Sequence, residues 1–200
     1  MNFFKRIVSF CVSTILLLFS SVSLSEQTPE AIMAIFAGGC FWCMQADFDK
    51  VPGVIQTVVG YTGGYTINPN YTQVSSGVTG HYEAIQVIYD PAKISYEQLL
   101  DIFWHNIDPT NSTGQFCDEG QQYKAVIFYS NVDQEKLAFI SRQQLIKSRH
   151  FSNVATEILP ATIFYPAEKY HQKFYKKNPI RYHFYRYYCG RDQRLRKLWE

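Results

Sequence analysis

The chain has 200 residues, with 19 basic and 17 acidic side chains, and 46% of its residues are hydrophobic. This length and composition fit one globular domain with an ample apolar core. The formal net charge of +2 is too small to suggest nucleic acid or an anionic membrane surface as a partner.

Residues 1–25 carry the three-part pattern of a secretory signal peptide. Lys5 and Arg6 form a short basic head, the run 7–19 has no charge, and small residues follow it. This pattern predicts export and cleavage, although a retained anchor is the alternative because the apolar run is short but real. Cleavage removes two basic residues and no acidic one, so 19 basic residues fall to 17 against 17 acidic ones. We therefore expect a single, formally neutral mature domain at 26–200.

The first predicted element of the mature chain is a strand at 32–37, and Gly38 and Gly39 follow it. Helical spacing then runs from Cys40 to Lys50, so Cys40 is expected at a strand-to-helix turn. The first N–H groups of a helix lack internal partners and its dipole favours an anion, so we expect a Cys40 pKa below the free value. The glycines would allow a positive φ beside the sulfur.

The later elements alternate between strands and helices. A strand is predicted at 54–61, and a loop rich in glycine, threonine and tyrosine follows it. Next come a strand from Tyr82, a helix at 94–107, a polar loop at 108–123, a strand at 124–129, a helix at 133–148 and a strand at 154–159. The order predicts a mixed α/β domain, and no GxGxxG or GxxxxGK loop indicates a nucleotide site.

Four cysteines remain in the mature chain: Cys40, Cys43, Cys117 and Cys189. An exported protein meets a compartment that permits disulfides, but disulfide scaffolds are shorter and denser in cysteine than this chain. A zinc site is weaker still, because Cys40 and Cys43 supply a single CxxC and the other two cysteines lie far apart. We therefore expect no metal, and we interpret the cysteines as a reactive thiol site.

Five segments, in order, carry a resemblance to a known family: "GGCFWC", "GYTGGYTINPNY", "GHYEAIQVIYDP", "QFCDEGQQY" and "YPAEKYHQKFYKKNP". From about Ile32 to the C-terminus the chain resembles peptide methionine sulfoxide reductase A. The resemblance implies a two-layer mixed α/β (α+β) sandwich with a ferredoxin-like plait at its core, in which 26–200 is one catalytic domain. It implies reduction of methionine S-sulfoxide in proteins, peptides and free methionine. It also implies a monomer without a bound cofactor, recycled by an external dithiol reductant such as a thioredoxin-like protein.

The resemblance assigns roles that the chemistry of sulfoxide reduction requires. A nucleophile must attack the sulfur while an acid protonates the oxygen, and Cys40 and Glu83 match the family's nucleophile and acid. Glu83 can act only if burial raises its pKa; otherwise it is an ordinary exposed strand carboxylate. Tyr71 and Tyr123 match two phenols that donate hydrogen bonds to the oxygen, and Asp118 matches a carboxylate that fixes this polar corner.

The aromatic pair after Cys40 has two interpretations of equal weight. Phe41 and Trp42 resemble the wall that receives the methyl group of the substrate, or they are core packing residues. The five histidines show no HExxH spacing, so we interpret them as structural or surface residues: His81, His105, His150, His171 and His183.

The thiol that recycles Cys40 stays open at this point. After substrate reduction Cys40 would carry a sulfenic acid, which condenses with a nearby thiol. Cys43 lies one helical turn away, and Cys189 lies in a tyrosine-rich tail where many family members have a mobile resolving cysteine. These two weigh equally, and a relay from one to the other would use both. Cys117 ranks behind them because a small packing role is the usual one for a buried cysteine.

Two other functions remain as alternatives. A thiol–disulfide exchange protein would use Cys40 and Cys43 and would not need Glu83, Tyr71 or Tyr123. A non-enzymatic binding module is disfavoured by a thiol at a helix start.

The expected compartment follows from the leader and the site together. Asn70 and Asn111 begin N-x-Thr sequons, and a glycan on Asn70 would crowd Tyr71. A bacterial periplasm, where the mature protein would have no stable membrane insertion, is therefore the expected location.

Overall fold

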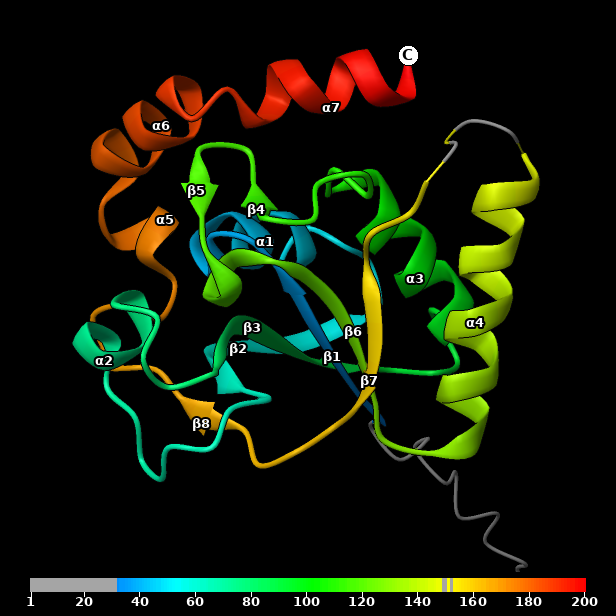
Figure 1. The fold of residues 1–200 in the computed structure, drawn as a ribbon, viewed down its shortest axis with the longest axis horizontal. Coiled ribbons are helices and arrows are strands. Elements are labelled where there is room, and N and C mark those ends of the chain that lie inside the picture. Colours follow the sequence, from blue (N-terminus) through cyan, green and yellow to red (C-terminus); the bar gives the residue numbers. More distant parts are fainter. Residues whose placement is uncertain (1–31, 149–150, 152) are drawn as a thin grey trace, which may run out of the picture.

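The computed structural model describes residues 32–148, 151 and 153–200 (Figure 1). The expected signal peptide at 1–25 and the first residues of the expected domain lie outside this part. Six strands form one sheet in the order β7-β6-β1-β3-β2-β8. They are β1 (Ile32–Gly38), β2 (Val54–Thr62), β3 (Tyr82–Tyr89), β6 (Ala125–Tyr129), β7 (Glu157–Pro160) and β8 (Tyr165–Pro166). Only β6 and β7 pair in parallel within it.

The centre of the sheet is a ferredoxin-like plait. Two βαβ units supply it: β1, α1 (Phe41–Phe48) and β2, then β3, α3 (Tyr96–His105) and β6. Their four strands lie in the order β6-β1-β3-β2 and are antiparallel to their neighbours. The expected fold class is therefore confirmed, as are the strands and helices predicted for these elements.

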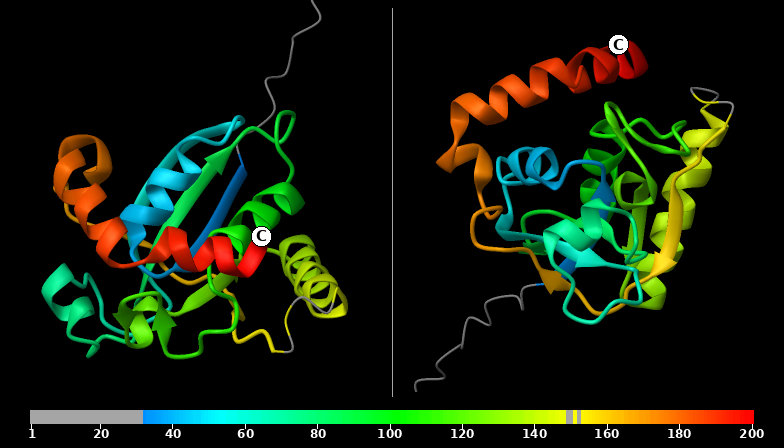
Figure 2. Two further views of the ribbon diagram at one scale, coloured as in Figure 1. Left: turned by 90° about the horizontal axis from the view of Figure 1, so that it is seen from above. Right: turned by 60° about the vertical axis from the view of Figure 1, so that its left-hand side comes forward.

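Both faces of the sheet are covered, which explains why its first strand is apolar throughout. Ala34 and Phe36 of β1 join the larger core with α1, α3 and α4 (Val132–Lys147). Ile35 and Ala37 point to the other face, where residues of the 159–164 connection pack. A strand buried on both faces needs no polar alternation. α1, α3 and α4 lie on one face of the sheet, whereas α6 and α7 cross the end of the fold (Figures 1 and 2).

Two segments that the sequence predicts as loops contain short elements. α2 (Tyr71–Ser75) begins with a reciprocal capping box between Asn70 and Gln73. The polar loop at 108–123 folds into a hairpin of β4 (Gly114–Gln115) and β5 (Asp118–Glu119), followed by the 3₁₀ turn η1 (Gln121–Tyr123). Such short elements give little periodicity in the sequence, so a loop was predicted instead.

The C-terminal tail is helical. It comprises α5 (Phe174–Lys177), α6 (Pro179–Tyr188) and α7 (Arg191–Trp199), and α6 and α7 run across the top of the view in Figure 1. Gly190, with φ +70°, separates α6 from α7, and a Cys117–Cys189 disulfide joins the end of α6 to the β4–β5 hairpin. No helix in the described ranges is long and apolar enough to cross a membrane.

Candidate active site

Cys40 lies at the junction of β1 and α1, where the sequence predicted a strand-to-helix turn. It is the N-cap residue of α1 and follows Gly39, whose φ is +77°. A Cβ on Gly39 would lie 2.6 Å from Cβ of Gln115, so this position needs glycine for both conformation and space. Gly38 has no positive φ, but a Cβ there would lie 2.7 Å from Sδ of Met44. The expected positive φ beside the sulfur is therefore confirmed, at Gly39.

A small pocket opens beside Cys40. Its volume is about 60 Å³, well below the ~300–1,000 Å³ of ordinary ligand pockets, so it admits the tip of a side chain. It brings together all the sequence candidates for the reaction and for substrate binding, with one further tyrosine. The lining residues are Cys40, Phe41, Trp42, Tyr71, Glu83, Asp118, Tyr123 and Tyr185.

Glu83 is a buried acid on β3. Glu83 is 3% exposed, and its Oε2 accepts a hydrogen bond of 3.1 Å from the N–H of Phe41. Burial raises the pKa of Glu83 to about 8 although that hydrogen bond opposes the shift, and the nearby Asp118 and Cys43 add to it. Glu83 is therefore largely protonated at neutral pH, and its interpretation as an exposed strand carboxylate is wrong.

The pKa of Cys40 shifts opposite to the sequence prediction. Burial raises it well above the usual value, and Cys43, Glu83 and Asp118 raise it further. The first N–H groups of α1 do not serve the sulfur, because Phe41 donates to Glu83 and the Cys40 N–H donates to Asp118. The helix start therefore stabilises two carboxyl groups, and Cys40 is a thiol in the substrate-free protein.

Cys43 lies one turn further along α1, with 1% of its surface exposed. The hydrogen bond from Cys40 lowers the pKa of the Cys43 thiol, burial opposes this, and the positive charges of Arg191 and Arg186 lower it further. The two cysteines therefore form a pair in which Cys40 donates its S–H to a Cys43 sulfur that ionises first.

Three tyrosines surround the polar side of the pocket. Burial, with Glu83 next in effect, raises the pKa of Tyr71 to about 12 and also raises that of Tyr123, so both phenols remain hydrogen-bond donors. The Tyr185 hydroxyl donates to Oδ2 of Asp118, whose pKa burial raises. Sequence reasoning missed Tyr185. Its position four residues before Cys189 is the only signal, and it does not distinguish Tyr185 from the chain's other tyrosines.

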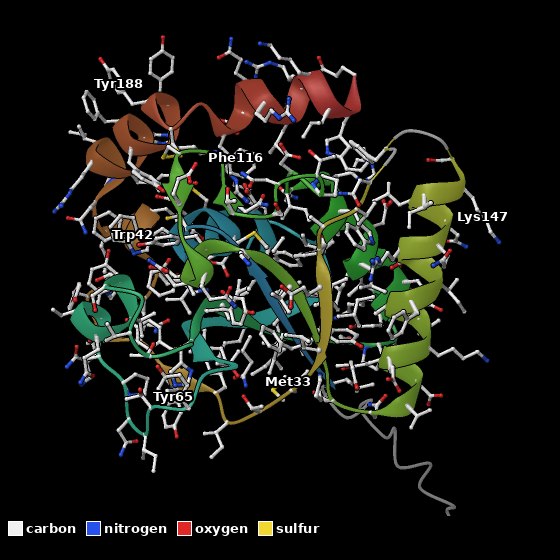
Figure 3. All side chains as sticks on the ribbon, in the orientation of Figure 1. Met33, Trp42, Tyr65, Phe116, Lys147 and Tyr188 are labelled. Carbon is white, nitrogen blue, oxygen red and sulfur yellow. A yellow bond between two sulfur atoms is a disulfide. The ribbon has the colours of Figure 1, made fainter. Side chains whose placement is uncertain are left out.

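Aromatic contacts hold Trp42 at the rim of the pocket. Its ring stacks on Phe174 at 3.8 Å between centroids, and its indole N–H donates to Nδ1 of His171 at 3.0 Å. Burial lowers the pKa of His171 to about 4, so the imidazole is neutral and accepts this bond. Phe41 is 1% exposed and packs against Tyr61, so it serves the core and lines the pocket as well. Figure 3 labels Trp42 beside α5.

The remaining candidate cysteines are bonded to each other. Cys117 and Cys189 have a Cα–Cα distance of 4.9 Å, whereas Cys40 and Cys43 are free. Cys117 is exposed, so its interpretation as a small packing residue is wrong. Within the described ranges, Cys117, Asp118 and Cys189 could together offer ligands to a metal ion. Their two sulfurs are joined in the disulfide, however, and the thiolate is the form that binds metals.

These features define a class of site. A cysteine at a helix start shares a small pocket with a protonated acid and phenolic donors, and it has a second thiol beside it. This arrangement is that of a thiol-dependent oxidoreductase.

Comparison with known proteins identifies the family. The model of the family "Peptide methionine sulfoxide reductase" matches residues 32–200. Peptide methionine sulfoxide reductase MsrA of Bacillus licheniformis is 51% identical over 168 residues, which cover 84% of this chain and 93% of that protein. The Bacillus subtilis MsrA is also 51% identical over 168 residues, covering 84% of this chain and 95% of that protein. The chain belongs to the peptide methionine sulfoxide reductase family.

Solved structures agree with this assignment. Methionine sulfoxide reductase A of Corynebacterium diphtheriae has a TM-score of 0.69 at 32% identity, covering 77% of this chain and 78% of that one. Reduced Mxr1 of Saccharomyces cerevisiae has a TM-score of 0.71 at 30% identity, covering 75% of this chain and 87% of that one.

Proposed function

We propose that this chain reduces methionine S-sulfoxide to methionine in oxidised proteins, in peptides and as the free amino acid. Family membership over residues 32–200 supports the activity. The observation that carries the mechanism is the pocket where the Cys40 sulfur, the protonated Glu83 and two phenols converge. A nucleophile and an acid in one small cavity are what sulfoxide reduction requires.

In the first step the sulfoxide oxygen is transferred to the Cys40 sulfur and methionine leaves. The proton of Cys40 passes to the ionised Cys43 sulfur, and the resulting Cys40 thiolate attacks the sulfoxide sulfur while Glu83 protonates its oxygen. The oxygen then moves as a hydroxyl group from the substrate sulfur to the Cys40 sulfur, and the bond between the two sulfurs breaks. Cys40 becomes a sulfenic acid, so the sulfoxide is reduced by two electrons and Cys40 is oxidised. Tyr71 and Tyr123 donate hydrogen bonds to the oxygen, and Asp118 keeps this polar corner in place. Phe41 and Trp42 receive the methyl group.

In the second step Cys43 resolves the sulfenic acid. Its sulfur attacks the sulfur of Cys40, a Cys40–Cys43 disulfide forms, and the hydroxyl leaves with a proton as water. Cys43 is a free thiol hydrogen-bonded to Cys40, whereas Cys117 and Cys189 are bonded to each other, which supports this order. Cys117 and Cys189 would act afterwards, as a second dithiol that reopens the first disulfide.

An external dithiol protein of the thioredoxin type then restores the thiols. Yeast Mxr1 has been solved in complex with Trx2, at 22% identity to this chain and a TM-score of 0.52. The chemistry above uses only side chains of one chain, so it needs no bound cofactor and a monomer suffices.

Export to a bacterial periplasm is the proposed location, on the strength of the basic head and apolar run at 1–25. Cell fractionation of the native protein, with mass spectrometry of its N-terminus, tests this. An uncleaved N-terminus in the cytosolic fraction would contradict it.

The activity is tested by incubating the purified protein with dithiothreitol and a peptide that contains methionine sulfoxide. We expect mass spectrometry to detect the loss of one oxygen atom from the peptide, and Cys40→Ser to prevent it. A protein that leaves the sulfoxide intact but exchanges disulfides of a model substrate would instead be a thiol–disulfide oxidoreductase.

A further inference from the structure

Arg191 is a buried cation without a hydrogen-bonded carboxylate. It is the first residue of α7, and 1% of its surface is exposed. Its guanidinium donates to the carbonyl oxygens of Gly38 and Asn106 and to Sδ of Met44, and it lies 4.5 Å from the ring centroid of Phe116. All these partners are neutral. Because a buried charge is costly unless another charge compensates it, the anion that balances Arg191 must be sought nearby.

The guanidinium lies under the turn that carries the reactive thiols. Gly38, whose carbonyl it binds at 3.2 Å, precedes Cys40 by two residues. Met44, whose Sδ it binds at 3.2 Å, directly follows Cys43. Nη1 would lie 3.8 Å from a Cβ placed on Gly39. Arg191 therefore contacts the chain on both sides of the cysteine pair, and Figure 3 shows Phe116 beneath the tail helices at this place.

A second arginine near the pair is already neutralised. Nη1 of Arg186 donates to Asp47 at 2.9 and 3.0 Å, and its Nε and Nη2 donate to Asp192 at 2.6 to 3.1 Å. Both arginines lower the pKa of Cys43, but only the charge of Arg191 lacks a carboxylate in direct contact.

Other charged and titratable groups face the pair from several elements. Around Cys43 they are Cys40 and Asp47 on α1, Glu83 on β3, and Tyr182, Tyr185 and Arg186 on α6. Arg191 also acts at a distance on Asp118 and Asp192. Asp118 is held by the Tyr185 hydroxyl and the Cys40 N–H, and Asp192 is bound to Arg186. Neither carboxyl group is therefore a dedicated partner of Arg191.

We propose that Arg191 is a positioning residue whose guanidinium stabilises the single negative charge carried by the Cys40–Cys43 dithiol. The tail brings this charge beneath the nucleophile turn, and the Cys117–Cys189 disulfide fastens the tail two residues before Arg191. With Arg191 present, one thiol of the pair is ionised at lower pH. The effect on turnover rests on the proposed function, whereas the effect on the dithiol does not.

The dithiol is titrated directly by the ultraviolet absorbance of its thiolate, from acid to mildly alkaline pH, with the Cys117–Cys189 disulfide intact. The Cys40→Ser/Cys43→Ser double variant is the blank, because it differs from the wild type only at these two sulfurs and retains all tyrosines. We expect Arg191→Met to raise the apparent pKa of the dithiol by about one unit or more, as loss of a nearby opposite charge does. Arg191→Lys should keep most of the wild-type value, since it keeps the charge.

Arg194→Met is the matched control. Arg194 lies on the same helix, and its side chain is 46% exposed and pairs with Asp108 at 2.7 Å. This variant should titrate like the wild type. Should Arg191→Met fail to fold, Arg191→Gln replaces it, because its amide can still donate to the Gly38 or Asn106 carbonyl without a charge.

The second measurement is the pH profile of kcat/KM for sulfoxide reduction driven by dithiothreitol. In the neutral Arg191 variants the acid limb should move to higher pH by the same amount as the thiolate titration. An unchanged titration in a folded neutral variant, or a lysine variant that behaves like the neutral ones, would overturn the proposal. A shifted titration in a protein without sulfoxide reductase activity would support the role of Arg191 and reject the proposed function instead.

Discussion

Cys40 and Glu83 share one small pocket but have opposite tasks in the proposed reaction. The sulfur must lose its proton to attack, whereas the carboxyl group must keep its proton until the oxygen needs it. Burial raises the pKa of both groups, which suits Glu83 and hinders Cys40. The neighbouring Cys43 offsets this for Cys40, because its sulfur ionises first and, as a thiolate, can accept the Cys40 proton at the moment of attack.

Cys40→Ser should abolish turnover, because a serine hydroxyl is a far weaker nucleophile toward sulfur than a thiolate. The variant should fold, since the replaced atom is nearly the same size. Turnover of the sulfoxide peptide with dithiothreitol is the measurement, and circular dichroism controls for folding. Wild-type turnover in the serine variant would reject Cys40 as the nucleophile.

Glu83→Gln should slow the chemical step by ~10² to 10⁴, the usual loss when a general acid is removed. The pKa of Glu83 is raised to about 8, so the acid is protonated below that pH and the wild-type rate should fall as pH rises through it. Single-turnover rates across this range check both points. An equal fall in the glutamine variant would assign the alkaline limb to another group.

The same substitution changes how stability depends on pH. Because the folded-state pKa lies above the unfolded value, the neutral acid contributes stability that is fully present below the unfolded pKa and lost as pH rises through about 8. Glutamine does not titrate. In urea unfolding, the free energy of unfolding of Glu83→Gln should therefore rise relative to that of the wild type as pH increases from the unfolded-state pKa of Glu83 to about 8.

Single residues were predictable where the sequence places them in a motif, and unpredictable where a distant segment changes their surroundings. The motifs located every lining residue of the pocket except Tyr185. The pKa of Cys40 was predicted in the wrong direction because the N–H groups at the helix start are taken by Glu83 and Asp118. These partners come from other elements, and no local pattern reveals that they use the same amides.

Elements with strong periodicity were predicted to within a few residues. β1 was found at 32–38 against a prediction of 32–37, and α4 at 132–147 against 133–148. The β4–β5 hairpin has strands of two residues each, too short for a hydrophobic pattern. The hairpin nevertheless contributes Asp118 to the pocket and Cys117 to the disulfide. Two candidate site residues therefore lie in an element that the sequence pattern does not predict.

The Cys117–Cys189 disulfide should stabilise the fold by about 2–4 kcal/mol, because it closes a long loop with a sequence separation of 72. Cys189→Ser should lower the free energy of unfolding in urea by about that amount, relative to the oxidised wild type. Cys117→Ser should match it, and the double variant should lose nothing further, since one cross-link is lost in each case. Additive losses would point to side-chain packing instead of the cross-link.

At the scale of the molecule, the tail and the β4–β5 hairpin together bring a second pair of cysteines towards the first. α6 and α7 cross the end of the plait where β1 meets α1. The disulfide joins Cys189 to the exposed Cys117, which directly precedes Asp118, the acceptor of the Cys40 N–H. In the proposed reaction the buried Cys40–Cys43 pair reduces the substrate, and the second pair, with its exposed Cys117, serves recycling.

Fully reduced protein without external reductant should therefore reduce two sulfoxides per chain. The first turnover forms Cys40–Cys43, and disulfide exchange with Cys117 and Cys189 restores those thiols for a second. Cys189→Ser should stop after one, with peptide mapping locating a Cys40–Cys43 disulfide. If Cys43→Ser still loses two thiols per sulfoxide through a disulfide of Cys40 with Cys189, then Cys189 resolves directly and the proposed order is wrong.

The pocket as a whole should distinguish the two sulfoxide epimers. The attacking sulfur of Cys40, the apolar wall of Phe41 and Trp42, and the polar corner of Glu83 and its neighbouring phenols occupy different sides of one cavity. A sulfoxide sulfur that presents its methyl group to one side, its oxygen to another and its open face to Cys40 leaves one direction for the peptide chain, so it fits in a single configuration. This agrees with the rule that each epimer has its own type of reductase. A racemic peptide should therefore stop reacting when about half is consumed, and chiral chromatography should find only the R epimer left.

Fresh racemic peptide added at that point should react again to about half, which shows that the enzyme has not been inactivated. Complete conversion would mean that the pocket leaves the sulfoxide free to turn, and would contradict the placement of the methyl group against Trp42.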